Sequence, residues 1–418
     1  MRIFSAVRHA SDPRRYYGGL WSANFYPALR LLGCEILESQ TDLMPASRFM
    51  HIASDFTAGE KECRARLTER ILAELQSAHR ERPVDLFLSY FYNAHFDPAG
   101  FAEVRRLGIP TVNFYCNSIY QFELVRDVAA AADFAWHAEK PARALYLAAG
   151  ARPVWVQMAA DPSVYFPVEG VVRRPVAGFV GQRYADRDRW AAALIRAGVP
   201  VDLYGPNWGA PSPTLAVHPE SVEPVETEYL GRPILSPGSR SAYREAVVGN
   251  WRREGPVRGT WRTWRQLVYR RESRQLLALC APHARGAVPF DEQKRVFAGF
   301  EVVLNFSNVW ADGRPGTALV PHVRLRDFEA PMCRVCYLTG YTEEIAEFYE
   351  LGREIDTYKT PDELVDKCRF YLGNTAAAER LRDAGFLRAR RDHTWGRRFE
   401  QLFAAIGLRM PSGSATRP

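Results

Sequence analysis

Charged residues gather in the stretch at 323–344, which reads VRLRDFEAPMCRVCYLTGYTEE. Arg324 and Arg326 stand two positions apart and are followed by Glu329, a β-prone run and a turn. Charged groups at the ends of strands and helices in an α/β sheet are typical of ligand sites. Because guanidinium groups match phosphate oxygens, the stretch predicts a nucleotide or phosphate site.

Reactive side chains also follow two predicted strands near the N-terminus. His9 and Asp12 come after a strand at about residues 1–7, and His95 and Asp97 come after the strand DLFLSY. A Rossmann-like sheet binds its ligands at this edge. A histidine or carboxylate there could deprotonate a hydroxyl group, whereas the alternative is a loop side chain with ordinary hydrogen bonds.

The loop expected after the first strand is rich in tyrosine and glycine. It contains Tyr17 and Gly19, and a helix is predicted at about residues 24–32. Glycine lets the backbone approach a ligand closely. The spacing is not that of a dinucleotide-binding fingerprint, so the loop alone does not identify the ligand.

Residues 251–276 combine tryptophan with arginine, and the part up to Arg274 holds eight arginines against two glutamates. Trp261, Trp264 and Leu267 fall near helical spacing. An amphipathic helix of this kind suits an anionic membrane surface. The same residues could stack on single-stranded nucleic acid, although we do not expect a nucleic-acid partner. The interpretation we favour packs the apolar stripe on the protein and leaves the arginines in water.

Composition narrows the class of protein. The net charge of +7 and the pI near 9.0 favour anionic partners. No apolar run reaches the roughly 18 residues of a membrane span, and the first residues do not form an apolar leader. We therefore expect a cytoplasmic protein, peripheral at the inner membrane face if residues 251–276 bind lipid. Cys333 and Cys336 form a lone CxxC with only His322 nearby, which predicts structural cysteines and no metal site.

Strands alternate with helices along most of the chain, which predicts parallel, helix-covered sheets. With 418 residues, two domains are expected. The alternation stops at the segment DPSVYFP, which contains two prolines, and resumes at VAGFVG. We predict domains at 1–165 and 166–395, with an insertion at about 210–282. A C-terminal helix and a disordered tail would occupy 396–418.

Four stretches stand in a specific order along the chain. They are HASDPRRYYGGLWSANF, DPSVYFP, FVGQRYADRDRW with VDLYGPNW, and LRDFEAPMC with YLTGYTEE and HTWGRRFEQLF. Together these cover most of residues 1–205 and 285–407 and resemble the CgeB-type, spore-maturation-like glycosyltransferases, related to the retaining family-4 enzymes. The resemblance implies the GT-B fold, in which two Rossmann-like domains face each other across a cleft. The first would bind the acceptor and the second the nucleotide-sugar donor.

The resemblance also implies how the residues would act. Departure of a nucleotide diphosphate can be stabilised by cationic side chains and N–H groups in place of a metal, so no cofactor is expected. The donor-binding candidates are Gly181, Arg183, Arg187, Gly205, Arg326 and Glu329. The arginines would hold the diphosphate and Glu329 the ribose hydroxyls, against the alternatives of structural ion pairs or solvated side chains. His95, His9 and Asp97 are the catalytic candidates, and Asp12, Tyr17 and Gly19 would contact the acceptor.

Two positions depart from the family-4 pattern. That pattern has a glutamate eight residues before Glu329, where this chain has Pro321, and a glycine after Cys333, where it has Arg334. The first glutamate's role is therefore absent or filled elsewhere, and Arg334 could add a phosphate ligand.

We predict a retaining sugar transfer from a nucleotide-diphosphate sugar to a hydroxyl of a glycan, lipid-linked saccharide, protein or small metabolite. A sugar-nucleotide epimerase of the same fold and a non-catalytic nucleotide- or glycan-binding scaffold are the alternatives. The residues do not choose the nucleotide, the sugar or the acceptor.

Overall fold

The computed structural model describes residues 1–9, 16–209, 228–234 and 239–410. The chain divides into two compact units, of which the first comprises Met1–Val164 and Asp392–Pro418 and the second Tyr165–Arg391. The chain enters the second unit within DPSVYFP, one residue from the predicted boundary. It returns to the first unit at Asp392, which the sequence does not predict.

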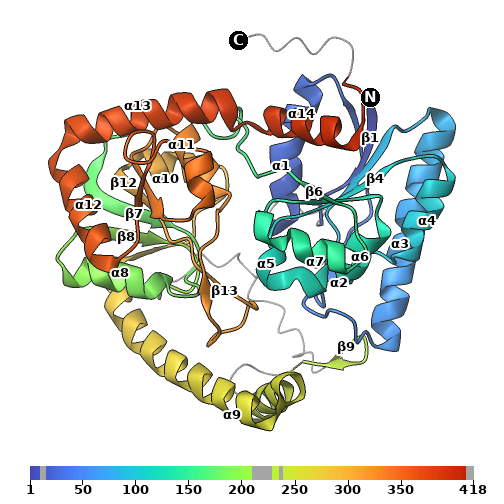
Figure 1. Ribbon diagram of the computed structural model, residues 1–418, viewed down its shortest axis with the longest axis horizontal. Coiled ribbons are helices and arrows are strands. Elements are labelled where there is room, and N and C mark those ends of the chain that lie inside the picture. The colour runs from blue at the N-terminus through green and yellow to red at the C-terminus, as the bar shows by residue number, and fades with distance from the viewer. Residues whose placement is uncertain (10–15, 210–227, 235–238, 411–418) are drawn as a thin grey trace, which may run out of the picture. The chain divides into compact units, whose positions relative to one another are not determined.

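The first unit is built on a six-stranded parallel sheet in the order β2-β1-β3-β4-β5-β6 (Figure 1). Its strands are β1 (Arg2–Ala6), β2 (Glu35–Glu38), β3 (Leu86–Ser89), β4 (Thr111–Tyr115), β5 (Phe134–His137) and β6 (Pro153–Trp155). Every residue of β1, β3, β4 and β5 is buried, as in parallel sheets covered on both faces. Because β1 pairs with β2 on one side and β3 on the other, the strand order reverses between β1 and β3.

Helices connect these strands. They are α1 (Tyr16–Leu31), α2 (Met44–Ser47), α3 (Ala58–Glu81), α4 (Ala99–Arg106), α5 (Ser118–Gln121), α6 (Arg126–Ala131), α7 (Arg143–Ala148) and the 3-10 helices η1 (Phe122–Leu124) and η2 (Lys140–Ala142). The long helix α3 starts at a capping box, in which Thr57 and Glu60 satisfy each other's backbone N–H groups. Helix α1 starts eight residues before the predicted residue 24, so Gly19 belongs to a helix and not to a loop.

Helix α14 (Trp395–Ile406) completes the core of the first unit. The ring of Trp395 is fully buried, and its indole N–H donates to Oδ1 of Asn24 over 3.2 Å. The same ring contacts Phe25 of α1 edge-on at 4.7 Å, and Phe399 packs against Phe25 at 5.2 Å. The C-terminal helix is therefore part of the first domain, whereas the sequence-based division had set residues 396–418 apart.

The second unit repeats the architecture with the strand order β11-β8-β7-β12-β15-β16, again all parallel. The strands are β7 (Arg174–Val180), β8 (Val201–Tyr204), β11 (Ala284–Gly286), β12 (Phe300–Asn305), β15 (Tyr337–Gly340) and β16 (Asp356–Tyr358). Two small antiparallel pairs lie outside this sheet: β9 (Glu228–Tyr229) with β10 (Arg232–Pro233), and β13 (Val309–Trp310) with β14 (Leu319–Val320). The strand order reverses between β7 and β12.

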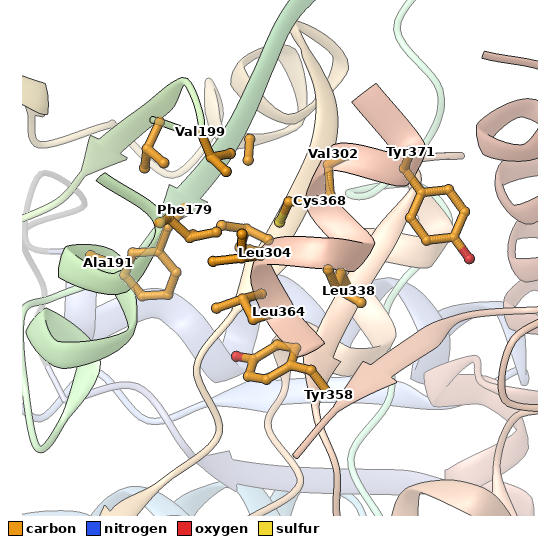
Figure 2. Packing of buried hydrophobic residues seen from close by; sticks show 14 of the residues in the cluster. Phe179, Ala191, Val199, Val302, Leu304, Leu338, Tyr358, Leu364, Cys368 and Tyr371 are labelled. Atoms are coloured by element: carbon orange, nitrogen blue, oxygen red, sulfur yellow. The ribbon is translucent and has the colours of Figure 1, made fainter. Parts of the chain in front are cut away.

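The helices of the second unit pack on both the sheet and each other. They are α8 (Arg187–Arg196), α9 (Arg240–Cys280), α10 (Gln293–Ala298), α11 (Arg326–Met332), α12 (Pro361–Gly373), α13 (Thr375–Asp392), η3 (Ala281–His283) and η4 (Glu344–Glu347). Figure 2 shows how Leu304 of β12 and Leu338 of β15 meet Leu364 and Cys368 of α12 in the core. Each of these four side chains is at most 1% exposed.

Helix α9 occupies most of the predicted insertion and contains a sharp kink. Gly255 adopts a φ of 79°, and Pro256 follows it, so that two helical segments meet at a turn. The segments fold back on each other, because Nδ2 of Asn250 donates to Oγ1 of Thr263 over 3.1 Å. A Cβ on Gly259 would lie 2.7 Å from the carbonyl carbon of Asn250, so the close approach requires glycine. Figure 1 shows this helical hairpin extending from the body of its unit.

The seven cysteines are all buried and free, in agreement with the structural role predicted for them. Burial raises the pKa of the Cys333 and Cys336 thiols, which therefore stay protonated. Among the residues that the structure describes, no group of three or more histidine, cysteine or acidic side chains is arranged to hold a metal ion. Of the helices described, none has both the length and the apolar composition needed to cross a membrane.

Candidate functional site

In open parallel sheets, ligands bind beyond the carboxyl ends of the strands, where the strand order reverses. In the first unit this position lies after β1 and β3, and it brings together two of the predicted residues. His9 follows β1 and His95 follows β3, and their ring centroids are 4.3 Å apart. Both side chains are buried. The pairing of these two histidines is a consequence of strand order that their separation in sequence does not show.

Hydrogen bonds define the protonation of both rings. The backbone N–H of Tyr92 donates to Nδ1 of His95 over 3.2 Å, so Nδ1 carries the lone pair and Nε2 carries the proton. That Nε2 lies 3.1 Å from Oγ of Ser47, whose hydroxyl donates to the carbonyl of Leu43. Nε2 of His9 donates to the carbonyl of Tyr90, which leaves the lone pair of His9 on Nδ1.

Burial keeps both imidazoles neutral. It lowers the pKa of His9 to about 4, although the bond to the Tyr90 carbonyl opposes the shift. Burial and the neighbouring His9 lower the pKa of His95 well below its usual value. A neutral imidazole at neutral pH can accept a proton or a hydrogen bond, which is what an acceptor hydroxyl would need.

Aromatic side chains surround the histidines. Tyr90 stacks on His9 at 5.0 Å, and Tyr92 stands edge-on to His95 at 5.3 Å. Tyr115 stacks on Tyr90 at 5.9 Å, and Trp21 contacts Tyr90 at 5.5 Å. All four rings are buried. The strand ends of this unit are therefore lined by rigid, uncharged rings.

The other predicted residues of the first unit have different positions. Oδ1 of Asp97 accepts the N–H of Ala99 at the start of α4, and Oδ2 pairs with Arg64 at 3.2 Å. These contacts are structural, so the geometry does not support Asp97 as a base. Gly19 lies in α1, where its carbonyl accepts the hydroxyl of Ser22. Tyr17 lies in the same helix, but the structure does not describe its side chain. Asp12 lies outside the described residues.

In the second unit, the loops after β7 and β8 meet at two of the predicted glycines. A Cβ on Gly205 would lie 2.4 Å from the carbonyl oxygen of Gly181, and Gly205 has a φ of 124°. The same Gly181 carbonyl accepts the indole N–H of Trp208 over 2.8 Å, and Trp208 is fully buried. Loop packing therefore explains both glycines, and Trp208 lies in the core of the unit.

Arg183 of the loop after β7 is held by the protein itself. Its Nη2 pairs with Oδ2 of Asp188 at 2.8 Å and donates to the carbonyl of Ser273 over 2.6 Å. Asp188 is buried, and its pKa is raised by burial although Arg183 opposes the shift. Contact with a diphosphate would require breaking this pair, so Arg183 as a phosphate ligand stays a prediction that the geometry does not favour.

Arg187 begins α8 and folds back over its own loop. Its Nη1 donates to the carbonyl of Gln182 over 2.8 Å. The guanidinium lies 5.4 Å from the ring centroid of Phe179 and 6.0 Å from that of Tyr184, within cation–π range. Arg187 is thus close to the strand ends, as predicted, with its orientation determined by two aromatic rings.

Glu329 and Arg326 form the structural ion pair that was the alternative to donor binding. Nη1 of Arg326 lies 2.9 Å from Oε2 of Glu329 and also donates to Gln293. The hydroxyl of Tyr165 donates to Oε1 of Glu329 over 2.6 Å. The Glu329 side chain is 4% exposed, and burial raises its pKa against the attraction of Arg326. A contact between Glu329 and ribose therefore stays a prediction.

Asp327, which the sequence did not single out, is the most highly connected carboxylate at the strand ends. Its Oδ1 accepts from Tyr337 and Thr339 over 2.8 Å each and from Asn305 over 3.2 Å. Its Oδ2 accepts the backbone N–H of Arg324 over 2.6 Å. Burial raises the pKa of Asp327, and these four donors counteract the shift. The carboxylate joins β12, β15 and the segment that carries Arg324.

Arg324 is the cation that the structure places at the strand reversal. Its Nη2 donates to the carbonyl of Asn308, just after β12, over 3.3 Å. Nδ2 of Asn308 donates in turn to Asp186, in the loop after β7, over 2.7 Å. Within the described part of the chain, Nε of Arg324 is buried without a hydrogen-bond partner. The sequence indicated both Arg324 and Arg326 as possible ligands, but the resemblance made only Arg326 a donor-binding candidate.

The two departures from the family-4 pattern have clear structural outcomes. Arg334 adopts a φ of 56°, so the backbone keeps the conformation that glycine would favour. Its guanidinium pairs with Glu379 at 3.0 Å and Asp383 at 2.6 Å on α13, which argues against the proposed phosphate contact. Pro321 lies between β14 and α11.

Two Rossmann-like units with parallel sheets, joined by a crossover and by a returning C-terminal helix, define the GT-B fold. The glycosyl transferase-like family model matches residues 232–404. This match includes α9, which the sequence analysis had set outside the resemblance, and it extends into α14 of the first unit. The chain therefore has the GT-B fold and contains a region that matches the glycosyl transferase-like family model.

Solved structures share the fold over nearly the whole chain. Sucrose-phosphate synthase from Thermosynechococcus elongatus is 13% identical with a TM-score of 0.53, and the alignment covers 97% of this chain and 100% of that one. HepE from Anabaena, in complex with UDP and glucose, is 12% identical with a TM-score of 0.52 over 97% and 99%. AviGT4, a glycosyltransferase involved in avilamycin A biosynthesis, is 16% identical with a TM-score of 0.50 over 97% and 98%. No curated protein matches the chain by sequence.

Proposed function

We propose that the protein transfers a sugar from a nucleotide-diphosphate sugar to an acceptor hydroxyl, with the donor bound by the second unit. The observation that carries this proposal is the position of Arg324 at the reversal between β7 and β12. One end of its guanidinium donates to the Asn308 carbonyl, and its buried Nε lacks a partner among the described residues. A half-buried, oriented guanidinium is suited to phosphate oxygens and to the charge that develops on a leaving diphosphate.

The second unit also offers backbone groups and a second cation for this task. The loop after β7 carries Arg187, which the rings of Phe179 and Tyr184 hold near the strand ends. The neighbours that share the fold include HepE bound to UDP-glucose, with a TM-score of 0.51 and 12% identity. These observations support a uridine or related nucleotide sugar as the donor class. The CgeB-type relationship and retention of configuration rest on the resemblance carried by the four stretches, which cover most of residues 1–205 and 285–407.

We assign the acceptor to the first unit. There, neutral His9 and His95 meet at the strand reversal beside aromatic rings, an environment suited to hydroxyl groups and to the apolar faces of sugars. In a retaining reaction the histidines would orient the acceptor, whereas in an inverting one Nδ1 of His9 would take the hydroxyl proton. A glycan, a lipid-linked saccharide, a protein or a small metabolite could provide the hydroxyl group.

Binding of a panel of nucleotide-diphosphate sugars, followed by mass spectrometry, tests the donor assignment. We expect one donor to bind, and Arg324→Ala to weaken its binding at least tenfold because a charge-assisted phosphate contact is lost. Arg334→Ala is the matched control, because that arginine follows α11, which Arg324 precedes, but pairs with acids of α13. Equal effects of the two substitutions, or no donor bound, would contradict the proposal.

Release of free nucleotide diphosphate distinguishes the reaction types. A transferase releases it in proportion to added acceptor, whereas a sugar-nucleotide epimerase interconverts two donors without acceptor. A non-catalytic scaffold would bind donor without turnover. The stereochemistry of the product, measured by the anomeric proton coupling, then decides between retention and inversion.

A further inference from the structure

The second segment of α9, residues 256–280, carries an apolar stripe that faces solvent. Val257, Trp261, Trp264 and Val268 follow the spacing i, i+4, i+7 and i+11, which places them on one helical face. Their exposed fractions are 81%, 59%, 52% and 45%. A stripe with this period normally packs against a protein core. The packing on the protein that we favoured from sequence is therefore wrong for Trp261 and Trp264, which the predicted stripe included.

The opposite face of the same segment makes the contacts that hold it in place. Gly259 and Thr263 are buried against Asn250 of the first segment of α9. Arg262 pairs with Glu254 and with Asp312, next to β13, at 2.8 Å each. The hairpin is thus fixed through one face. Because the hairpin packs through the opposite face, its apolar stripe remains exposed to solvent.

Several arginines of this segment lack acidic partners. Within the described residues, none of the following forms an ion pair: Arg258, Arg265, Arg270, Arg271 and Arg274. All five are exposed. By contrast, Arg262 on the packed face is neutralised by two carboxylates, and Glu272 of the same segment is paired with Arg189. Of these five, Arg258, Arg265 and Arg271 lie within about 90° of the stripe around the helix axis, so positive charge borders the apolar face.

A cavity of about 310 Å³ opens beside the stripe. Trp264, Arg265 and Val268 contribute to its lining, together with Trp310 of β13 and residues 316–319 leading into β14. Trp310 is 5% exposed, so one wall is a firmly packed ring. Glu272 in the lining is paired with Arg189, whereas Arg265 is not paired with an acid. The cavity thus presents a free cation next to aromatic surface.

We propose that the stripe and its arginines form a docking surface for an anionic lipid bilayer, with the helix lying in the membrane interface. Tryptophan and aliphatic side chains would enter the boundary between headgroups and acyl chains, while the arginines contact lipid phosphates. The cavity at Arg265 takes one headgroup. This surface stands independently of the reaction proposed above, because none of its residues belongs to the donor or acceptor sites.

Charge and geometry favour lipid over other occupants. A second copy of the chain docked through the same face would bring arginine against arginine. A nucleic acid would use free aromatic faces, but Trp261 and Trp264 stack on each other at 4.6 Å with an interplanar angle of 23°. The aliphatic Val257, Leu267 and Val268 would gain nothing from a phosphodiester backbone, whereas they lose water-exposed area in a bilayer.

Sedimentation of the full chain with vesicles tests the proposal. We expect binding to phosphatidylcholine vesicles in which about a third of the lipid is anionic phosphatidylglycerol. Binding to pure phosphatidylcholine should be weak, and high salt should release the protein from the anionic vesicles. Trp261→Ser with Trp264→Ser should reduce the partition at least tenfold. Arg258→Glu with Arg271→Glu should do the same, since one cation near an anionic surface strengthens binding roughly fivefold. Arg265→Gln alone should weaken binding more than Arg258→Gln alone, because only Arg265 lines the cavity.

Matched controls are available on the same unit. Phe370 on α12 is 52% exposed, and Arg380 on α13 is exposed, so Phe370→Ser with Arg380→Glu makes the same kind of change elsewhere. Circular dichroism of each variant reports whether it is folded. Equal binding to neutral and anionic vesicles, or variants that bind like the control, would overturn the proposal. So would self-association or oligonucleotide binding that depends on the two tryptophans without any binding to vesicles.

Discussion

The two strand reversals of this protein use opposite physical chemistry. In the first unit, the residues that meet are neutral histidines enclosed by tyrosine and tryptophan rings. In the second, they are carboxylates, guanidinium groups and amides, linked through Asp186, Asn308, Arg324 and Asp327. The same topology has thus produced one neutral, aromatic site and one charged, hydrogen-bonded site.

This difference corresponds to what each partner in sugar transfer needs. A diphosphate requires fixed positive charge and N–H donors that do not reorganise as the leaving group departs. A sugar hydroxyl requires hydrogen-bonding groups that are not already charged, beside a surface that excludes water. Substitutions that change the charge of either site should therefore have different consequences in the two units.

The largest effect is expected at Asp327. Replacing it with alanine leaves the buried donors of Tyr337, Thr339 and Asn305 without their acceptor. We expect Asp327→Ala to lower the free energy of unfolding of the second unit by about 4 kcal/mol. Denaturant unfolding followed by circular dichroism measures this. Asp366→Ala, at an exposed position of α12, should change stability by less than about 0.5 kcal/mol.

Acid should act mainly on the first unit. Folded His9 binds a proton only near pH 4, whereas in the unfolded chain it does so near 6.5, so the unfolded state binds more protons between these values. The stabilisation is present above pH 6.5 and is lost as the pH falls toward 4, by about 3 kcal/mol for this residue. Unfolding of the chain and of His9→Gln at pH 7, 5.5 and 4.5 tests it. The variant should lose less stability on acidification, and parallel pH profiles would contradict the assignment.

A smaller effect is expected at Arg183. Without its guanidinium, Asp188 is left buried, but its raised pKa lets it take up a proton, which limits the destabilisation of Arg183→Ala to about 2 kcal/mol. The destabilisation should shrink as the pH is lowered, because protonated Asp188 no longer needs a counter-charge. Arg189→Ala is the comparison, since the Arg189–Glu272 pair on the same helices is 48% and 40% exposed and should contribute less than about 1 kcal/mol. Equal effects of the two would show that burial of Asp188 is unimportant.

The smallest effect concerns Arg334, which lies outside both strand reversals. Arg334→Gly relieves a left-handed backbone conformation but removes two ion pairs, so stability should change little. Arg334→Ala removes the same pairs and keeps the strained backbone. We therefore expect the glycine variant to be more stable than the alanine variant by about 1 kcal/mol in thermal unfolding. The reverse order would show that the backbone at this position is not strained.

Much of the fold could be predicted from sequence because it depends on local patterns. Alternating strands and helices, the prolines of DPSVYFP and the cap of α12 at Thr360 all have local signals. The start of α1 was missed because paired glycines are typical of a loop, and only the burial of Trp21 and Phe25 compensates for their poor helix propensity. The position of α14 was missed because an amphipathic helix does not indicate which sheet it covers.

The site was predictable only in part, for a related reason. The rule that ligands bind after the strands was enough to place His9 and His95 at the same edge of the sheet, but it did not show that their rings meet. It could not show that Ser273, ninety residues further along the chain, holds Arg183, or that Tyr165 holds Glu329. Such partners are decided by tertiary packing. They give Arg183 and Glu329 structural contacts, so that the phosphate and ribose roles stay predictions.

The return of the chain to the first unit has a consequence for biosynthesis. Phe25 and Trp136 are translated early, whereas Trp395 and Phe399, which cover them, follow only after the entire second unit. On the ribosome the first sheet therefore exposes aromatic surface until α14 has been translated. A nascent chain stalled before residue 395 should bind chaperones through this surface, and one released after α14 should not.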